Sequence, residues 1–246
     1  MKQVIYSIQE NAPLTANVYR MVLRGDTSPI AAPGQFVNLQ LDGLYLRRPI
    51  SVCDVEGDAL TLIYKVVGKG TEQLSHMVPG QSLDTLSGLG NGYDLSCAGD
   101  RPLLVGGGVG VPPLYLLAKK LRGQGAAVTV CLGFNAADEI FYEDEFRALG
   151  CDVRVSTVDG SHGAKGFVTD ILPENPTHYY ACGPEPMLKA VFKALDCPGQ
   201  LSFEARMGCG FGACMGCTCE TIAGYRRICK DGPVMRKEEL LWNVQV

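Results

Sequence analysis

Short apolar or alternating runs, separated by turn residues, fill the first 98 residues of the chain. Alternation with a period of two is typical of half-buried strands, and Gly, Pro, Asn and Asp mark the turns between them. The predicted strands are Lys2–Gln9, Val18–Leu23, Gln35–Leu41, Ile50–Asp54, Leu60–Val67 and Ser82–Ser87. Short strands at this spacing predict a six-stranded antiparallel barrel over residues 1–98.

The pattern changes over residues 99–200, where apolar runs alternate with segments of helical periodicity. The predicted strands are Leu103–Val105, Val128–Leu132, Val153–Thr157 and Tyr179–Cys182. The predicted helices are Leu114–Leu121, Glu139–Leu149 and Pro184–Leu195. Strands that alternate with helices predict an α/β domain with a parallel sheet.

Residues 201–246 follow the strand-like run Gln200–Glu204 and contain a glycine-rich stretch with five cysteines. Three of them, Cys209, Cys214 and Cys217, have the spacing Cys-x4-Cys-x2-Cys, which is that of plant-type [2Fe–2S] proteins. A segment this short cannot hold a core unaided, so a metal centre would stabilise it. The sequence therefore predicts a small C-terminal cluster module. A structural zinc site is the alternative, although zinc folds usually carry paired Cys-x2-Cys knuckles.

Composition narrows the class of protein. A net charge of −4 gives no reason to expect nucleic acid or an acidic membrane surface as a partner. The sequence contains no apolar run of about 18 residues, so a membrane-spanning helix is not expected. An odd number of cysteines without a secretion signal favours the reducing cytoplasm over a disulfide framework. Six further cysteines are scattered along the chain, and most of them are expected to be small buried hydrophobes: Cys53, Cys97, Cys131, Cys151, Cys182 and Cys197.

Two turns in the α/β segment suggest a nucleotide site. The first is Gly106-Gly107-Gly108-Val109-Gly110, between a predicted strand and a predicted helix. Its backbone N–H groups could approach a pyrophosphate, although a bare tight turn is the alternative. Val111 stands where Gly-x-Gly-x-x-Gly needs its third glycine, so a usual Rossmann dehydrogenase is disfavoured. The second turn, Cys182-Gly183-Pro184, is expected at the same sheet edge.

The barrel segment carries a possible flavin signature, Arg48-Pro49-Ile50-Ser51. A guanidinium beside a hydroxyl suits a phosphate, and a strand backbone can bind an isoalloxazine edge. Ile63-Tyr64-Lys65 follows, and Gly70 and Thr71 open a predicted helix that offers a second anion site. A surface ion pair is the alternative role for Arg48.

In this order, the Arg-Pro-Ile-Ser strand, the two glycine turns and the cysteine loop resemble the ferredoxin-reductase-like flavoproteins. Within that group the chain is most similar to the electron-transfer subunits of dihydroorotate dehydrogenase B. The run Phe203–Cys214 and the closing Cys229-Lys230-Asp231-Gly232-Pro233-Val234 carry the specific part of the resemblance, which covers the whole chain.

The resemblance implies three cofactor sites and no catalytic acid or base in this chain. FAD would be bound by Arg48, Pro49, Ile50, Ser51, Ile63, Tyr64, Lys65, Gly70 and Thr71. NAD(H) would be bound by Gly106, Gly107, Gly108, Val109, Gly110, Cys182, Gly183 and Pro184. The [2Fe–2S] ligands would be Cys209, Cys214, Cys217 and Cys229, with Cys219 as a non-ligand.

The resemblance also implies a partner, a catalytic subunit with FMN that oxidises dihydroorotate to orotate in pyrimidine biosynthesis. Two copies of each subunit would form a heterotetramer. Electrons would pass through the cluster and FAD to NAD+. NAD is preferred over NADP because the stretch after the third strand of the α/β segment offers Asp159 and no immediate base, although Lys165 is within reach in sequence. The alternatives are a related NAD(P)H–FAD–[2Fe–2S] reductase subunit for another partner, such as a ferredoxin:NADP or sulfide-type oxidoreductase, and a zinc-stapled binding module.

Overall fold

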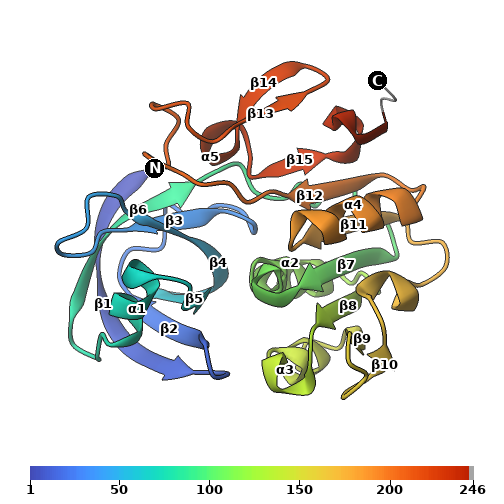
Figure 1. Ribbon diagram of the computed structural model, residues 1–246, viewed down its shortest axis with the longest axis horizontal. Helices are drawn as coiled ribbons and strands as arrows, with labels where there is room; N and C mark the ends of the chain where they lie inside the picture. The colour runs from blue at the N-terminus through green and yellow to red at the C-terminus, as the bar shows by residue number, and fades with distance from the viewer. Residues whose placement is uncertain (244–246) are drawn as a thin grey trace.

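The structure is a computed structural model that describes residues 1–243 (Figure 1). A barrel in blue and cyan lies beside an α/β domain in green to orange, and the red C-terminal segment lies above both. None of the helices in the described part of the chain is long and apolar enough to cross a membrane.

The N-terminal barrel is closed and antiparallel, with the strand order β1-β2-β5-β4-β3-β6. Its strands are β1 (Lys2–Pro13), β2 (Val18–Arg24), β3 (Phe36–Leu39), β4 (Arg48–Glu56), β5 (Ala59–Lys65) and β6 (Ser82–Leu89). Helix α1 (Lys69–Ser75) connects β5 to β6. Alternate residues such as Tyr6, Ile8 and Leu62 fill the interior and have no exposed surface. The predicted six-stranded barrel is therefore confirmed.

The second domain is built on a seven-stranded sheet with the order β10-β9-β8-β7-β11-β12-β15. The strands are β7 (Pro102–Gly107), β8 (Thr129–Phe134), β9 (Asp152–Thr157), β10 (Ala164–Lys165), β11 (His178–Cys182), β12 (Gly199–Ser202) and β15 (Val234–Arg236). All pairs are parallel except β12–β15. The predicted parallel sheet is confirmed, and β15 adds an antiparallel edge strand that was not predicted.

Helices cover both faces of this sheet. Helices α2 (Pro113–Gly123) and α3 (Glu143–Ala148) pack on the face that includes Leu104, and α4 (Glu185–Ala194) packs on the face of Leu103 and Val105. Short 3-10 turns η1 (Gly108–Gly110), η2 (Ala137–Glu139) and η3 (Val168–Ile171) connect these elements. Alternate residues of β7 thus face opposite hydrophobic clusters, as expected for a strand buried on both sides.

One predicted helix was wrong in extent. The sequence predicted a helix over Glu139–Leu149, but the segment contains η2 and the shorter α3. Tyr142 adopts a left-handed conformation with φ of 66° immediately before α3. Phe141 and Tyr142 are both buried in the cluster under α2, so tertiary packing of two aromatic rings overrides the helical pattern.

The C-terminal segment contains more regular structure than its polar sequence suggested. It includes the hairpin β13 (Thr218–Thr221) and β14 (Gly224–Arg227), then α5 (Ile228–Asp231), β15, η4 (Lys237–Glu239) and η5 (Leu241–Asn243). Because β12 and β15 belong to the large sheet, the module is joined to the α/β domain by backbone hydrogen bonds. The division at residues 98/99 and 200/201 stays a prediction, and residues 244–246 of its last segment lie outside the described residues.

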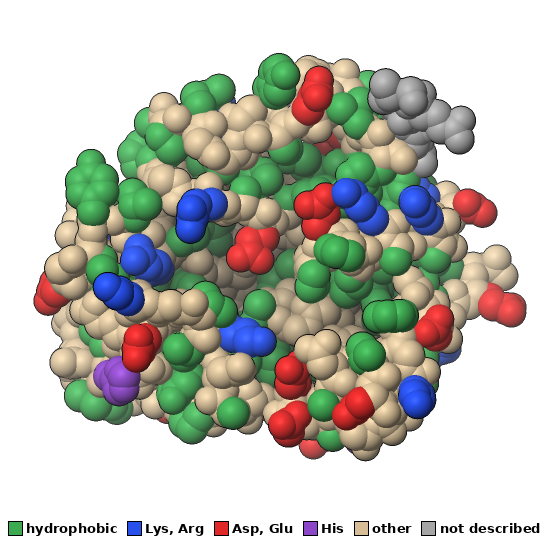
Figure 2. All heavy atoms as spheres, in the orientation of Figure 1, with side chains coloured by type: hydrophobic (Ala, Val, Ile, Leu, Met, Phe, Trp, Pro, Cys, Tyr) green, Lys and Arg blue, Asp and Glu red, His purple; other side chains and the backbone are tan. Residues whose placement is uncertain are grey.

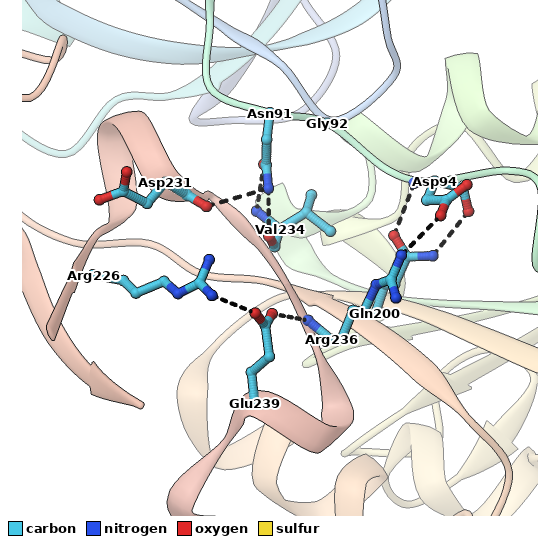
Figure 3. Close-up of a pocket in the computed structure, with 9 residues that line it drawn as sticks. All are labelled: Asn91, Gly92, Asp94, Gln200, Arg226, Asp231, Val234, Arg236 and Glu239. Carbon is cyan, nitrogen blue, oxygen red and sulfur yellow. Dashed lines mark hydrogen bonds and ion pairs between the residues drawn. The ribbon is translucent and has the colours of Figure 1, made fainter. Parts of the chain in front are cut away.

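Residues 90–101, between β6 and β7, form an interdomain segment, and a pocket of about 210 Å³ marks its junction with this module (Figure 3). Asn91 Nδ2 donates to the carbonyl of Val234 at 2.7 Å, and the Val234 N–H donates back to Asn91 Oδ1 at 3.2 Å. Ion pairs Arg236–Asp94 at 3.1 Å and Arg226–Glu239 at 2.9 Å lie on its walls. Asn91 and Asp94 thus hold the module to the segment, whereas the Arg226–Glu239 pair lies within the module.

We expect the barrel interior to dominate the stability of the N-terminal domain. Ile8→Ala removes a fully buried side chain of β1 and should lower the free energy of unfolding by about 2–5 kcal/mol. Ile5→Ala, on the same strand but 60% exposed, should cost less than about 1 kcal/mol. Urea unfolding followed by circular dichroism measures both, and equal losses would contradict the assigned interior.

Candidate functional site

The two glycine turns meet at one edge of the sheet. Strands β7 and β11 are parallel neighbours, and Gly106 is paired with Cys182. The strand order reverses here, because β8 and β9 lie on one side of β7 while β11 and β12 lie on the other. Ligands of open α/β sheets bind outside the carboxyl ends of strands at such a switch point. The expectation that both turns face the same edge is confirmed.

Close packing of these turns explains their glycines. A Cβ atom on Gly110 would overlap the carbonyl of Cys182, and one on Gly107 would lie 2.5 Å from Met187 Sδ. A Cβ atom on Gly183 would lie 2.6 Å from Met187 Cε. Val109 is 40% exposed at the tip of the first turn. The backbone there is open to a ligand, while side chains are excluded from the contact between the turns.

Two residues of this region serve the scaffold. Val111 is fully buried beside α2, so the position where a third glycine would stand is used for packing. Burial raises the pKa of the Cys182 thiol to about 12, so this thiol is neutral at pH 7. Tyr93, from the interdomain segment, donates to the carbonyl of Ala181 at 3.3 Å and packs edge-on against Tyr180. These contacts fix β11 just before the second turn.

The barrel brings its two predicted anion-binding elements together. The Arg48 guanidinium lies over Gly70 at the start of α1, and a Cβ atom on Gly70 would overlap it. Arg48 donates to the carbonyl of Leu46 and forms no ion pair with any residue between 1 and 243. The Thr71 hydroxyl accepts from the Val67 N–H at 2.9 Å, so it closes the turn before the helix.

The remaining residues of the flavin signature divide between two faces. Ile50 packs against the barrel interior, whereas Ser51 pairs with Phe36, whose side chain packs outside the barrel. Tyr64 is also an interior residue, and its hydroxyl donates to Asn11 Oδ1 at 2.9 Å. Ile63 packs in the cluster shared with the α/β domain. Tyr64 therefore supports the barrel with its side chain, and only its backbone is free to meet a ligand.

The face shown in Figure 2 is hollowed at its centre, between the barrel on the left and the α/β domain on the right. Helix α2 contacts β4 across this junction, and Lys119 of α2 forms an ion pair with Asp54 of β4 at 2.9 Å. The flavin signature and the nucleotide turns are thus carried by two domains that are fixed to each other.

Four cysteines of the C-terminal module lie in two pairs. The Cys209 N–H donates to Cys214 Sγ at 3.4 Å, and the Cys214 N–H donates to Cys209 Sγ at the same distance. The Cys229 N–H donates to Cys217 Sγ, also at 3.4 Å. In residues 1–243 no three or more His, Cys, Asp or Glu residues form a single metal-binding group. Two thiol pairs are the donor set that two irons of a [2Fe–2S] cluster would need.

Backbone N–H groups surround the pair Cys209 and Cys214, called the outer pair because Cys214 is exposed, whereas Cys217 and Cys229 of the inner pair are buried. Cys209 Sγ accepts from Ala213 at 3.2 Å, and Cys214 Sγ accepts from Gly216 at 3.5 Å. Burial opposes ionisation of Cys209, but backbone hydrogen bonds from Cys214, Phe211 and Ala213 outweigh it and lower its pKa to about 6. N–H groups aimed at sulfur stabilise thiolates and the negative charge of a cluster. The loop is therefore chemically suited to bind iron through sulfur.

Cys219 differs from these four. Its Sγ lies 3.9 Å from Met235 Sδ and takes no part in the hydrogen bonds that link the two thiol pairs. The hydrophobic cluster that its side chain packs against also contains Cys217 and Cys229. Arg227 braces the loop, because it donates to the carbonyl of Gly212 at 2.9 Å and pairs with Asp231 at 3.0 Å. The ligand set remains a prediction, and the position of Cys219 favours its assignment as a non-ligand.

Sequence reasoning missed one residue that joins the two sites. Asn38 lies on β3, is 1% exposed, and donates from Nδ2 to the carbonyl of Cys209 at 3.1 Å. An asparagine within the apolar run Phe36–Leu39 was the available signal, because Asn is depleted in strands. Its partner is 171 residues away in sequence, so no local pattern could identify the contact.

Comparison with known proteins agrees with this geometry. Residues 204–241 match the iron–sulfur cluster binding domain of dihydroorotate dehydrogenase B, and residues 104–193 match the oxidoreductase NAD-binding domain. A relative from Geobacillus sp. (strain WCH70), named dihydroorotate dehydrogenase B (NAD(+)), electron transfer subunit, is 46% identical over 98% of this chain and 99% of its own. The chain belongs to this family. A Fusobacterium nucleatum member with the same name is 44% identical over 93% of this chain and 94% of its own.

Solved structures agree with the family at the level of the fold. The structure of an NADH-dependent reduced ferredoxin-NADP oxidoreductase has a TM-score of 0.87 at 31% identity and covers 97% of this chain and 90% of its own. A ferredoxin NADP+ reductase from Neisseria gonorrhoeae has a TM-score of 0.69 at 17% identity, over 79% of this chain and 90% of its own. The ferredoxin-reductase-like fold, with a C-terminal iron–sulfur module, is thus confirmed for this family member.

Substitution at Gly110 tests the contact between the two turns. Gly110→Ala places a Cβ atom against the Cys182 carbonyl and should lower the free energy of unfolding by about 1–3 kcal/mol and weaken NAD(H) binding. Gly123→Ala, at the end of α2 in open space, should raise stability by about 0.4–1 kcal/mol. Thermal unfolding and nucleotide titration measure both effects, and a neutral Gly110→Ala variant would refute the packing argument.

Proposed function

We propose that this chain is an oxidoreductase subunit that passes electrons from a partner dihydroorotate dehydrogenase subunit to NAD+. The observation that carries the proposal is that four cysteines form two thiol pairs on a loop whose backbone N–H groups point at sulfur. The same chain also carries a flavin strand and two nucleotide turns that meet at one sheet edge. The relatives that match nearly the whole chain are named as electron transfer subunits of dihydroorotate dehydrogenase B.

The residues of the chain divide the cofactor binding among three elements. When bound, FAD exchanges hydride with NAD(H) and single electrons with a [2Fe–2S] cluster. Arg48 and the start of α1 at Gly70 would hold the FAD phosphates, and the partly buried start of β4, Arg48–Ser51, would meet the ring system. The Gly106–Gly110 turn and Cys182–Pro184 would orient NAD(H). No acid or base is required of this chain.

The electron donor lies on another protein in this proposal. The catalytic subunit would carry FMN and convert dihydroorotate to orotate in pyrimidine biosynthesis, and two copies of each subunit would form a heterotetramer. All eleven cysteines are free in the structure, which supports a reducing compartment such as the cytoplasm. Asp159, directly after β9, supports NAD rather than NADP. A base is also present there, because Lys165 of β10 pairs with Thr157 and its side chain packs against Gly160.

A related reductase subunit for another partner is the second candidate. The 31% identity to the ferredoxin-NADP oxidoreductase structure favours it, since the likeness covers 97% of this chain. The higher identity to the dihydroorotate dehydrogenase B relatives supports the first candidate. The two differ in partner, so the electron donor decides between them.

Co-expression with the FMN subunit from the same genome tests the function directly. The two chains should co-purify, and the complex should reduce NAD+ with dihydroorotate under anaerobic conditions, with much slower reduction of NADP+. The FMN subunit alone should reduce neither nucleotide. A chain that purifies alone and accepts electrons only from reduced ferredoxin would contradict the proposal.

Single cysteine substitutions test the ligand set. Replacement of Cys209, Cys214, Cys217 or Cys229 by serine should abolish the cluster signals in visible absorption and electron paramagnetic resonance, because a cluster needs four thiolates. Cys219→Ser is the matched control, and it should retain iron content and spectra, since its Sγ contacts Met235. Loss of the cluster in Cys219→Ser, with retention in Cys229→Ser, would overturn the assignment.

A further inference from the structure

Asn38 forms a direct polar contact between the barrel and the cysteine loop. Val37 and Leu39, its neighbours on β3, belong to the barrel interior, so the side chain of Asn38 points outward. Its Nδ2 donates to the carbonyl of Cys209 at 3.1 Å, and the residue is 1% exposed. The bond therefore joins one predicted cluster ligand to a strand of the flavin domain.

The same residue borders the flavin signature. Asn38 is paired with Pro49 of β4, and residues directly opposite in an antiparallel ladder share a face of the sheet. Phe36, two residues earlier, is paired with Ser51 and packs in the hydrophobic cluster that includes Cys217 and Cys229. The edge of β3 thus pairs with the flavin strand β4, while its outward face contacts the cysteine loop.

The contact is close and rigidly supported. Gly210 has a φ of 79°, and a Cβ atom there would overlap Asn38 Nδ2, so only glycine allows the loop to approach this strand. Arg47 donates to the carbonyl of Asn38 at 3.4 Å and to that of Asp84 at 3.0 Å, and so links the backbone of Asn38 to β6. Asn38 is therefore held in place before any partner binds.

One half of the Asn38 amide has no partner. Among the residues that the structure describes, none donates to its Oδ1, although this atom is buried. A buried acceptor without a donor costs about 1–3 kcal/mol, more than a typical hydrogen bond returns. An apolar side chain of the same shape would avoid that cost. Stability alone therefore does not account for an asparagine here, and its contact with the cluster loop does.

We propose that Asn38 is a positioning residue that fixes the cluster loop against the flavin strand and so sets the rate of electron transfer between FAD and the cluster. The inference rests on the proposed function, because it assumes that both cofactors bind. The amide acts through the carbonyl of Cys209, whereas the nucleotide turns follow β7 and β11 in the other domain. The hydride step and the cluster step should therefore respond differently to its removal.

The experiment compares Asn38→Leu and Asn38→Asp, which keep the size of the side chain and remove its N–H donor, with Asn17→Leu at an exposed position. Anaerobic stopped-flow reduction by NADH separates flavin reduction from the following reduction of the cluster, which rapid-freeze electron paramagnetic resonance detects. Hydrogen–deuterium exchange of the loop amides from Cys209 to Ala213 provides a readout that does not depend on activity.

Both Asn38 variants should reduce flavin within about 2-fold of the native rate, while cluster reduction slows by about 10-fold or more, as for other second-layer supports of a metal site. Loop exchange should accelerate in both and stay native in Asn17→Leu. Loss of the cluster from one variant with full FAD content would support the same role. Native cluster reduction and native loop exchange in both variants would overturn the inference. A native chain without FAD or iron would instead refute the proposed function.

Discussion

The edge pairing of β15 with β12 is the interaction on which the rest of the site depends. Gln200 pairs with Arg236, Leu201 with Met235 and Ser202 with Val234, so the last strand of the chain extends the nucleotide-binding sheet. The chain between these strands carries all four predicted cluster ligands, and its ends are therefore fixed on the α/β domain. The cysteine loop is then long enough to reach the barrel, where Asn38 meets Cys209.

A single hydrophobic cluster reinforces that arrangement. It includes Phe36 of the barrel, Val105 and Leu201 of the sheet, and Cys217 and Cys229 of the module. The inner thiol pair is thus buried where the three parts meet, while Cys214 of the outer pair is exposed. Asn38 also ties Cys209 of the outer pair to the barrel, so both pairs border the flavin domain and Cys214 is the exposed thiol among the four. This geometry fits one-electron exchange with a second protein.

Periodic patterns in the sequence predicted most of the scaffold, because they report local burial. Alternation along β1 and β6, and the glycine turn after β7, are visible without tertiary information. The helix predicted from Glu139 was wrong because Phe141 and Tyr142 are buried by a distant helix. Strand β15 was missed because it is three residues long and depends on pairing with β12. Long-range pairing leaves no local period to detect.

The cysteines show the same limit within the site. Spacing identified Cys209, Cys214 and Cys217, but it could not show which thiols receive backbone N–H groups. Of the six scattered cysteines, Cys53 and Cys131 are buried, Cys97 in the interdomain segment is exposed, and the other three are intermediate, namely Cys151, Cys182 and Cys197, so the prediction that most are buried holds fully for two. Burial raises the pKa of the Cys131 thiol to about 12, so Cys131 and the low-pKa Cys209 are chemically unlike. Environment, rather than residue type, separates ligands from core residues.

Cofactor stoichiometry of the anaerobically purified chain tests the central claim most directly. Visible absorption together with iron, sulfide and flavin assays should show two irons, two sulfides and one FAD per chain, as a [2Fe–2S] flavoprotein requires. A colourless protein that contains zinc and no flavin would contradict the account.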